Sequence, residues 1–173
     1  MKITSFTPIV TEKSTVLILG SMPGKKSLDL QQYYAHSQNS FWQIMGAICG
    51  ANSDLPYADR VQQLNEGGIA VWDVLKHCER EGSLDSAIRS DSEVPNDFEQ
   101  FLETYPMISH IFFNGQKAEK SFRKKVWPNL FSQIRDRITL TTLPSTSPAN
   151  TQQTREKKIE IWQEKITAVL QTP

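Results

Sequence analysis

Short apolar runs alternate with longer amphipathic stretches along most of the chain. Four of these runs are too short for helices and rich in branched side chains, which is typical of buried β-strands. They occupy residues 16–19, 69–72, 108–113 and 138–143. Between them the apolar residues fall at helical spacing, so the sequence predicts strands and helices in alternation.

The clearest helix begins at Asn39 or Ser40, repeats apolar residues over 41–48, and ends at Gly50. Further helices are expected at residues 57–64, 96–105, 117–127 and 151–170. Strands that alternate with helices pair in parallel through right-handed crossovers. The predicted fold class is therefore α/β: a three-layer α/β/α sandwich around a short, mainly parallel four-stranded sheet, in a single domain over residues 1–173.

Two regions lie outside this pattern. Residues 1–15 are a polar lead-in, of which Phe6 to Val10 is expected to tuck against the fold. Residues 76–95 are polar and rich in charge, Ser and Asp. We expect this second region to form an excursion rather than part of the core.

The loops that follow the predicted strands are expected to form a binding site. In an α/β sheet of this kind, ligands bind beyond the carboxyl ends of the strands. Four segments should converge there: residues 20–39, the residues after Trp72, residues 114–116 and residues 144–150. Three of the four carry Asn, Ser or aromatic residues, which suit a planar polar ligand.

Charge and cysteine content narrow the possible partners. Nineteen basic residues balance nineteen acidic ones, so contact with nucleic acid must rest on local patches. Lys25 and Lys26 lie in the first site loop and are the better phosphate candidates, whereas the basic run over 117–125 can equally be a solvated helix face. Cys49 and Cys78 have no metal-ligand spacing with histidines, so no metal and no other cofactor is expected.

The sequence has no apolar run of membrane length and no apolar core of a secretion signal at its start. We therefore expect a cytoplasmic protein with no membrane partner, and we take a monomer as the default.

The loop between the first strand and the first clear helix carries the most specific motif. It reads GSMPG at residues 20–24 and YAHSQNSFW at residues 34–42. This motif resembles the first motif of the uracil-DNA glycosylase superfamily and is most similar to the hypoxanthine-DNA (deoxyinosine) glycosylase branch. Residues 143–150, LPSTSPAN, take the place of the second motif, and Asn114 takes the recognition position after the third strand. The resemblance covers nearly the whole chain.

The resemblance implies a base-excision repair enzyme, a monofunctional DNA glycosylase that hydrolyses the N-glycosidic bond of a base flipped out of damaged DNA, double- or single-stranded. Tyr34 would stack on the flipped base and Asn114 would hydrogen-bond its edge, with Ser21 and Met22 also against the base. The residues expected to bind the DNA itself are Lys25, Lys26, Ser145, Ser147, Pro148, Ala149 and Asn150.

One departure from the superfamily affects the chemistry. Met22 occupies the position where uracil-cleaving relatives have a water-activating Asn or Asp. The hypoxanthine branch resembles this chain in that respect, and there Asn39 takes over the positioning of water. Asn39 is thus the predicted catalytic residue, although from the sequence alone a plain helix cap is an equal alternative. Asp73 ends a buried strand at the same edge and is the second candidate for the water, with a capping or loop role as the simpler interpretation.

Several functions stay open at this point. Hypoxanthine is the expected base and uracil the second, and a mismatch-specific uracil/thymine glycosylase is the alternative enzyme. Because Met22 cannot activate water, a catalytically silent module that binds lesion DNA is also possible. A nucleotide-binding protein with a phosphate loop at residues 20–24 is disfavoured, because the lysine and hydroxyl of such a loop are out of register.

Overall fold

The four predicted strands pair into one parallel sheet in the computed structural model, which describes residues 1–171. The last two residues of the expected domain lie outside the described residues. In spatial order the strands are β3 (Ile69–Asp73), β2 (Val16–Gly20), β6 (His110–Asn114) and β7 (Thr139–Leu143). All neighbours are parallel, so their carboxyl ends lie at one edge. The α/β class is confirmed.

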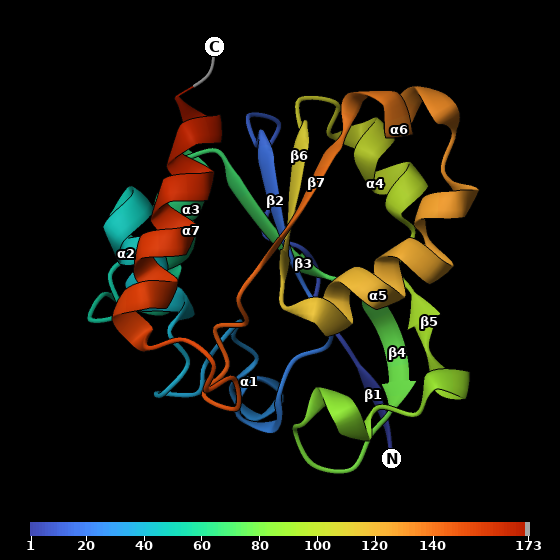
Figure 1. Cartoon of the computed structure of the whole chain (residues 1–173), viewed down its shortest axis with the longest axis horizontal. Helices are drawn as coiled ribbons and strands as arrows, with labels where there is room; N and C mark the ends of the chain where they lie inside the picture. Colours follow the sequence, from blue (N-terminus) through green and yellow to red (C-terminus); the bar gives the residue numbers. More distant parts are fainter. Residues whose placement is uncertain (172–173) are drawn as a thin grey trace.

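Helices cover both faces of this sheet, as the three-layer prediction requires (Figure 1). One face carries α2 (Phe41–Cys49), α3 (Tyr57–Glu66) and α7 (Arg155–Leu170), and the other carries α4 (Phe98–Thr104), α5 (Gln116–Lys125) and α6 (Ser132–Arg137). Successive residues of β2 serve the two faces: Ile18 packs with the α2 side, and Leu19 packs with the α4 side. Among the helices of residues 1–171, none combines the length and apolar character needed to cross a membrane.

Two helices begin later than the sequence predicted because capping residues decide where they start. Asp97 accepts a hydrogen bond from the backbone N–H of Gln100 at 3.1 Å, so α4 begins at Phe98. Thr154 does the same for Lys157 at 3.2 Å, and α7 begins after it. Both side chains satisfy a backbone donor that the first helical turn leaves free.

The prediction that residues 76–95 form an excursion outside the core is wrong. The segment contains most of β4 (Leu75–Glu79), which pairs antiparallel with β1 (Lys2–Thr4) and β5 (Val94–Pro95) in a second sheet. Cys78 and Ile88 are buried in the main core. Only two of the five β4 residues are buried, so the polar positions hide the strand in the sequence. The predicted contact of Phe6 to Val10 is confirmed, because Ile9 is buried and bridges Val71.

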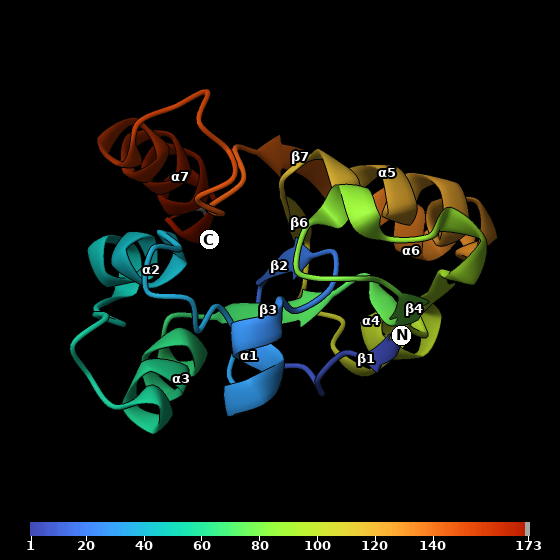
Figure 2. The ribbon, with the colours of Figure 1, turned by 90° about the horizontal axis from the view of Figure 1, so that it is seen from below.

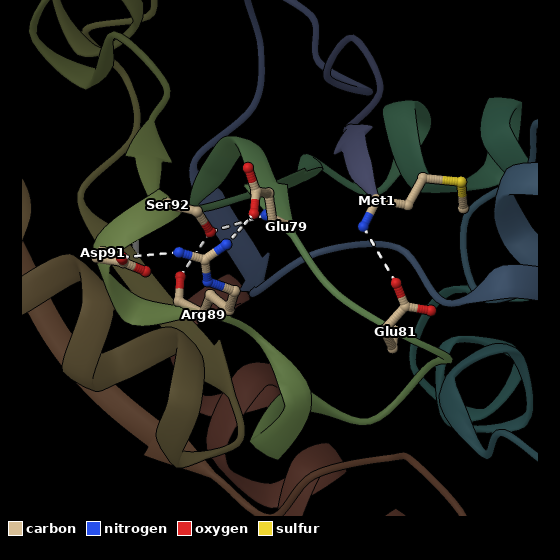
Figure 3. A network of polar contacts seen from close by, with 6 residues as sticks. All are labelled: Met1, Glu79, Glu81, Arg89, Asp91 and Ser92. Carbon is tan, nitrogen blue, oxygen red and sulfur yellow. Dashed lines mark hydrogen bonds and ion pairs between the residues drawn. The ribbon is translucent and has the colours of Figure 1, made fainter.

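The small sheet is fixed at the surface by a polar network (Figure 3). Arg89 pairs with Glu79 on β4 and with Asp91, the latter at 2.9 Å. Ser92 donates to the carbonyl oxygen of Arg89 and accepts from the N–H of Glu79. Exposed ion pairs of this kind contribute at most about 1 kcal/mol each. Their main effect is to fix the position of a chain segment, because they anchor both of its ends. This segment includes η1 (Asp85–Ala87), which forms a wall of the site described below.

The sequence also missed two short helices and, besides η1, two further 3₁₀ turns. α1 (Lys25–Leu30) lies within the first site loop, and α6 precedes β7. The turns are η2 (Ser90–Ser92) and η3 (Trp127–Asn129). At six residues each, the two helices are too short to show helical periodicity in the sequence.

Candidate active site

A pocket of about 530 Å³ opens at the carboxyl edge of the parallel sheet. Figure 1 shows the loop after β7 and the segment after β4 on either side of α1 at this edge, and in Figure 2 both lie on one side of α1. The lining consists of residues 20–27, 33–34, 36, 39, 73, 83–86, 114 and 145–150. The structure therefore brings all the site residues predicted from the sequence together, and it adds a wall at residues 83–86 that the sequence did not indicate.

The inner part of the pocket depends on the absence of a side chain at Gly20. A Cβ atom there would lie 2.6 Å from Asp73 Oδ1 and 2.9 Å from the hydroxyl oxygen of Tyr34, which is too close for either. Gly20 and Asp73 are register partners at the ends of β2 and β3. The glycine thus lets an acidic and a phenolic group from different segments approach the same piece of backbone.

Tyr34 is held in a defined position by its backbone and its ring. Its φ of 53° lies in the left-handed region, which is unfavourable for a residue with a side chain. The ring stacks on Phe41 with centroids 4.0 Å apart. Its buried hydroxyl makes no hydrogen bond of standard geometry in residues 1–171. Burial, followed by the charge of Asp73, raises its pKa, and an interaction with Asn114 opposes this rise. The tyrosine presents an immobilised ring to the pocket.

Asn39 lines the pocket and also caps α2. Its Oδ1 accepts a hydrogen bond from the backbone N–H of Phe41 at 3.0 Å, while Ser40, the N-cap by position, makes no side-chain cap bond. Within residues 1–171, Asn39 Nδ2 has no hydrogen-bond partner. The cap uses one lone pair of the oxygen and leaves the other lone pair and the amide N–H groups available. The capping and catalytic interpretations of Asn39 are therefore compatible.

Asn114 is largely engaged within the protein. Its Nδ2 donates to Thr146 Oγ1 and its Oδ1 accepts from the Thr146 N–H, both at 2.9 Å. The pair ties the end of β6 to the loop after β7. One N–H and one lone pair remain for a ligand, so the predicted contact with a base edge must use this remaining capacity. Next to it, Gly115 has a φ of 92°, and a Cβ there would lie 3.0 Å from Ser145 Cβ.

The loop after β7 is held mainly by its own polar groups and by a buried lysine. Ser145 accepts from the N–H of Ser147, and Asn150 donates to the carbonyl oxygen of Ser145, both at 3.2 Å. Lys158 of α7 donates to the carbonyl oxygens of Ser147 at 3.1 Å and Asn150 at 2.9 Å. Burial lowers the pKa of this lysine.

The role of Lys158 was missed by sequence reasoning, although a signal existed. Lys158, Trp162 and Ile166 follow each other at four-residue spacing, and all three are buried on one face of α7. A lysine on the apolar stripe of a helix needs a polar partner. Here the partners are carbonyl oxygens of the second-motif loop.

The wall at residues 83–86 holds the first-motif loop in place. Ser21 Oγ donates to Asp85 Oδ1 at 2.6 Å, and the N–H of Lys25 donates to Ser83 Oγ at 2.9 Å. The buried Arg80 donates to the carbonyl oxygen of Pro23 at 2.7 Å. These contacts join segments about sixty residues apart in sequence, so local pattern could not reveal them.

The electrostatics of the pocket differ between its inner end and its mouth. Burial, reinforced by the charge of Asp85 and opposed by Arg80, raises the pKa of Asp73 to about 7. Asp85 is exposed as a residue, but its carboxyl turns onto Ser21, and withdrawal from water raises its pKa too. Lys25 and Lys26 are exposed, with Lys25 paired to Asp29 at 3.1 Å. Within residues 1–171, no three His, Cys, Asp or Glu side chains are grouped to hold a metal ion.

Two basic features of the sequence mainly contact other groups of the protein: the basic run of α5 and His36. The basic run of α5 does not line the pocket: Lys117 pairs with Glu93, and Arg123 bonds to Glu119 at 3.1 Å. These contacts favour a helix face within the protein's own charge network. His36 lines the pocket, but its Nδ1 accepts from the N–H of Gln38 at 3.2 Å and so stabilises the loop.

Comparison with known proteins agrees with the motifs. A family model described as the uracil DNA glycosylase superfamily matches residues 7–166. Curated proteins named hypoxanthine DNA glycosylase are similar: one from Methanosarcina barkeri is 38% identical over 119 residues (68% of this chain, 74% of the relative), and one from Methanosarcina acetivorans is 41% identical over 114 residues (65% and 71%). A solution NMR structure described as a candidate uracil DNA glycosylase from Methanosarcina acetivorans has a TM-score of 0.75 and 32% identity, over 95% of this chain and 98% of that one. The chain belongs to the uracil DNA glycosylase superfamily.

Proposed function

We propose that this protein is a monofunctional DNA glycosylase of base-excision repair that releases a deaminated base, with hypoxanthine as the first substrate and uracil as the second. The observation that carries the proposal is the pocket itself, which gathers Met22, Tyr34, Asn39 and the second-motif loop in one lining. The curated relatives named hypoxanthine DNA glycosylase support the choice of base. A volume of about 530 Å³ lies within the range of small-molecule sites and accommodates a purine.

Base binding in this proposal uses the ring of Tyr34. Phe41 stacks on one face of the ring, so the other face is the one on which a flipped base would stack. Stacking of a base on an aromatic side chain is worth about 1–3 kcal/mol, which offsets part of the cost of taking the base out of the duplex. The rigid backbone of Tyr34 keeps the ring in place before the base arrives.

Asn39 is the proposed catalytic residue. The bond from Phe41 N–H fixes the orientation of Asn39 Oδ1, and the second lone pair of this oxygen can accept a hydrogen bond from the attacking water. The water oxygen bonds to C1′ as the bond from C1′ to the base breaks, the bonding electrons leave with the base, and the proton of the water passes to solvent or to the departed base. Positioning of this water would supply the rate.

The proposed DNA contacts follow the charge distribution. Lys25 and Lys26 at the mouth would bind phosphates, together with the loop over 145–150, whereas the buried carboxyl of Asp73 repels them. With this arrangement the uncharged base would enter the inner pocket, and the phosphates would stay at its mouth. We further propose that the protein is cytoplasmic and acts on double- or single-stranded DNA. We propose a monomer because residues of one chain line the pocket.

The test uses oligonucleotides that carry hypoxanthine, uracil or xanthine, in duplexes with each opposing base and as single strands. Alkali then cleaves any abasic site. We expect strand cleavage at hypoxanthine first and at uracil more slowly. Absence of cleavage on every substrate would refute the enzymatic proposal.

A second candidate function is supported by Met22. Because this side chain cannot accept a proton from water, the pocket could bind a flipped base without releasing it. Such a module would retard lesion-containing DNA in a mobility shift more strongly than undamaged DNA, with no abasic product after long incubation. Base release in the first assay would eliminate this candidate.

A further inference from the structure

Asp73 lines the pocket, and its carboxyl has no hydrogen-bond donor among residues 1–171. The residue is 4% exposed, and its Oδ2 is buried without a hydrogen-bond partner among residues 1–171. Most buried polar atoms in proteins have a partner. A carboxyl without a donor, on a residue that lines a binding pocket, indicates that the ligand supplies the donor.

The surrounding groups do not provide that donor. Asp85 carries the same charge, and its Oδ1 is already bonded to Ser21. Arg80 directs Nε to the carbonyl oxygen of Gly82 and Nη2 to that of Pro23, and it makes no hydrogen bond to Asp73. The hydroxyl of Tyr34 also approaches Gly20 and makes no bond to Asp73. The free acceptor therefore persists although three polar side chains lie around it.

Deamination creates the kind of hydrogen-bond donor that the carboxylate of Asp73 lacks. In adenine and cytosine, a ring nitrogen without hydrogen lies beside the carbon that bears the amino group. Deamination turns that carbon into a carbonyl and puts a hydrogen on the ring nitrogen, giving the N–H of hypoxanthine or uracil. A carboxylate oxygen accepts from this N–H and repels the lone pair of the parent base. Enzymes of this kind read a flipped base through its Watson–Crick edge, where this change occurs.

We infer that Asp73 is a specificity-determining residue whose carboxylate accepts the ring N–H that deamination creates. This inference rests on the proposed function and deepens it. It gives one reason why the same pocket would take a deaminated purine or a deaminated pyrimidine, since both present the same N–H beside a carbonyl. Gly20 is part of the device, because only a residue without a side chain lets Asp73 lie there.

The acidity of the group makes the inference testable in the unmodified protein. The pKa of Asp73 is raised to about 7, and the charged or titratable groups around it are Asp85, Arg80, Tyr34 and Tyr33. Above this pKa the carboxylate accepts the N–H. Below it the protonated form offers a donor, which suits a base that lacks the N–H, so selectivity should fall as the pH falls from 8 to 6.

The experiment compares duplexes that contain deoxyinosine or 2′-deoxynebularine, whose purine lacks both the carbonyl and the N–H. For each protein, the single-turnover rate constant on deoxyinosine divided by that on 2′-deoxynebularine gives a selectivity ratio. Comparing the ratios of two proteins cancels the intrinsic reactivity of the two nucleosides. We expect Asp73→Asn to narrow the wild-type ratio by about tenfold to a hundredfold, the value of a hydrogen bond to a charged group. Asp59→Asn is the matched control, and its ratio should stay at the wild-type value because Asp59 is exposed on α3 and does not line the pocket.

The outcomes separate the inference from the function on which it rests. An equal slowing of both substrates by Asp73→Asn would overturn the inference and assign the residue to the water or to the fold. A wild-type ratio that does not change between pH 8 and 6 would overturn it without any variant. Release of neither base by the wild type, nor of uracil, would refute the proposed function and the inference with it.

Discussion

The two halves of the pocket use their polar groups differently. The reactive half, Tyr34, Asn39 and Asp73, leaves side-chain polar atoms without partners in residues 1–171. The supporting half, Asn114, Lys158 and the loop over 145–150, binds most of its polar atoms to itself. Unpaired buried groups cost stability, and internal hydrogen bonds restore it. The comparison indicates that the chemistry lies in the reactive half and that the supporting half fixes the shape around it.

The largest expected effect is on the free energy of unfolding, which the buried charge of Asp73 lowers. Its pKa is about 7 in the folded state and 3.8 ordinarily, so the folded state binds the proton more tightly than the unfolded state. The contribution of this proton to the free energy of unfolding is complete below pH 4 and is lost as the pH rises to 7. Asp73→Asn should therefore raise the free energy of unfolding at pH 8, by up to about 4 kcal/mol, and should change it little at pH 4. Urea unfolding at both pH values measures this. Equal free energies of unfolding for the wild type and Asp73→Asn at pH 8 would show that the buried charge does not destabilise the reactive half.

Asn39→Ala should remove most of the activity with little effect on the fold. The loss of a preorganised hydrogen-bonding group costs on the order of a hundredfold in rate, or about 3 kcal/mol. The lost cap costs only about 1 kcal/mol of stability. Single-turnover release of hypoxanthine measures the first effect, and thermal unfolding measures the second. Asn39→Asp is the control, since it keeps both the cap and the acceptor and should retain far more activity than the alanine variant. Full activity in Asn39→Ala would place the chemistry elsewhere.

Gly20→Ala should distort the reactive half directly. The added methyl would lie 2.6 Å from Asp73 Oδ1 and 2.9 Å from the Tyr34 hydroxyl, and overpacking of this kind costs about 1–3 kcal/mol. Gly24→Ala is the matched control in the same loop, because its nearest neighbour, Ser83, lies 3.8 Å away. Chemical unfolding should show a loss for Gly20→Ala and little change for Gly24→Ala. Similar losses in both would contradict the close packing at Gly20.

The smallest effect is expected in the supporting half. Lys158→Met keeps the length of the side chain but removes two hydrogen bonds to the carbonyl oxygens of Ser147 and Asn150. We expect binding of lesion DNA to weaken by about tenfold, since a hydrogen bond to a charged group is worth about 1.5–3 kcal/mol and water replaces part of it. Fluorescence anisotropy measures the change. Lys157→Met is the control, because Lys157 is exposed and its side chain bonds only to Glu160 among the described residues. Equal binding by both variants would show that the loop does not need Lys158.

The site was predictable from the sequence where its residues are close together in the chain. Residues 20–24 and 34–42 carry the family motif, and the rule that parallel strands end at one edge placed Asp73 and Asn114 beside them. The engagement of Asn114 by Thr146 was not predictable, because it depends on how the loop after β7 folds back over 32 residues. The same holds for Ser21 and Asp85, which meet across 64 residues.

The parallel sheet, the two helical layers and the edge at which the pocket opens could be predicted from the sequence, because buried strands and helices each repeat apolar residues at a local period. Three features became visible only in the folded chain: β4 belongs to a second sheet, Asp85 reaches the pocket, and the carboxyl of Asp73 has no donor among residues 1–171. The physical reason is that burial and hydrogen bonding of a polar group depend on neighbours from distant segments, and a local pattern carries no information about which neighbours those are.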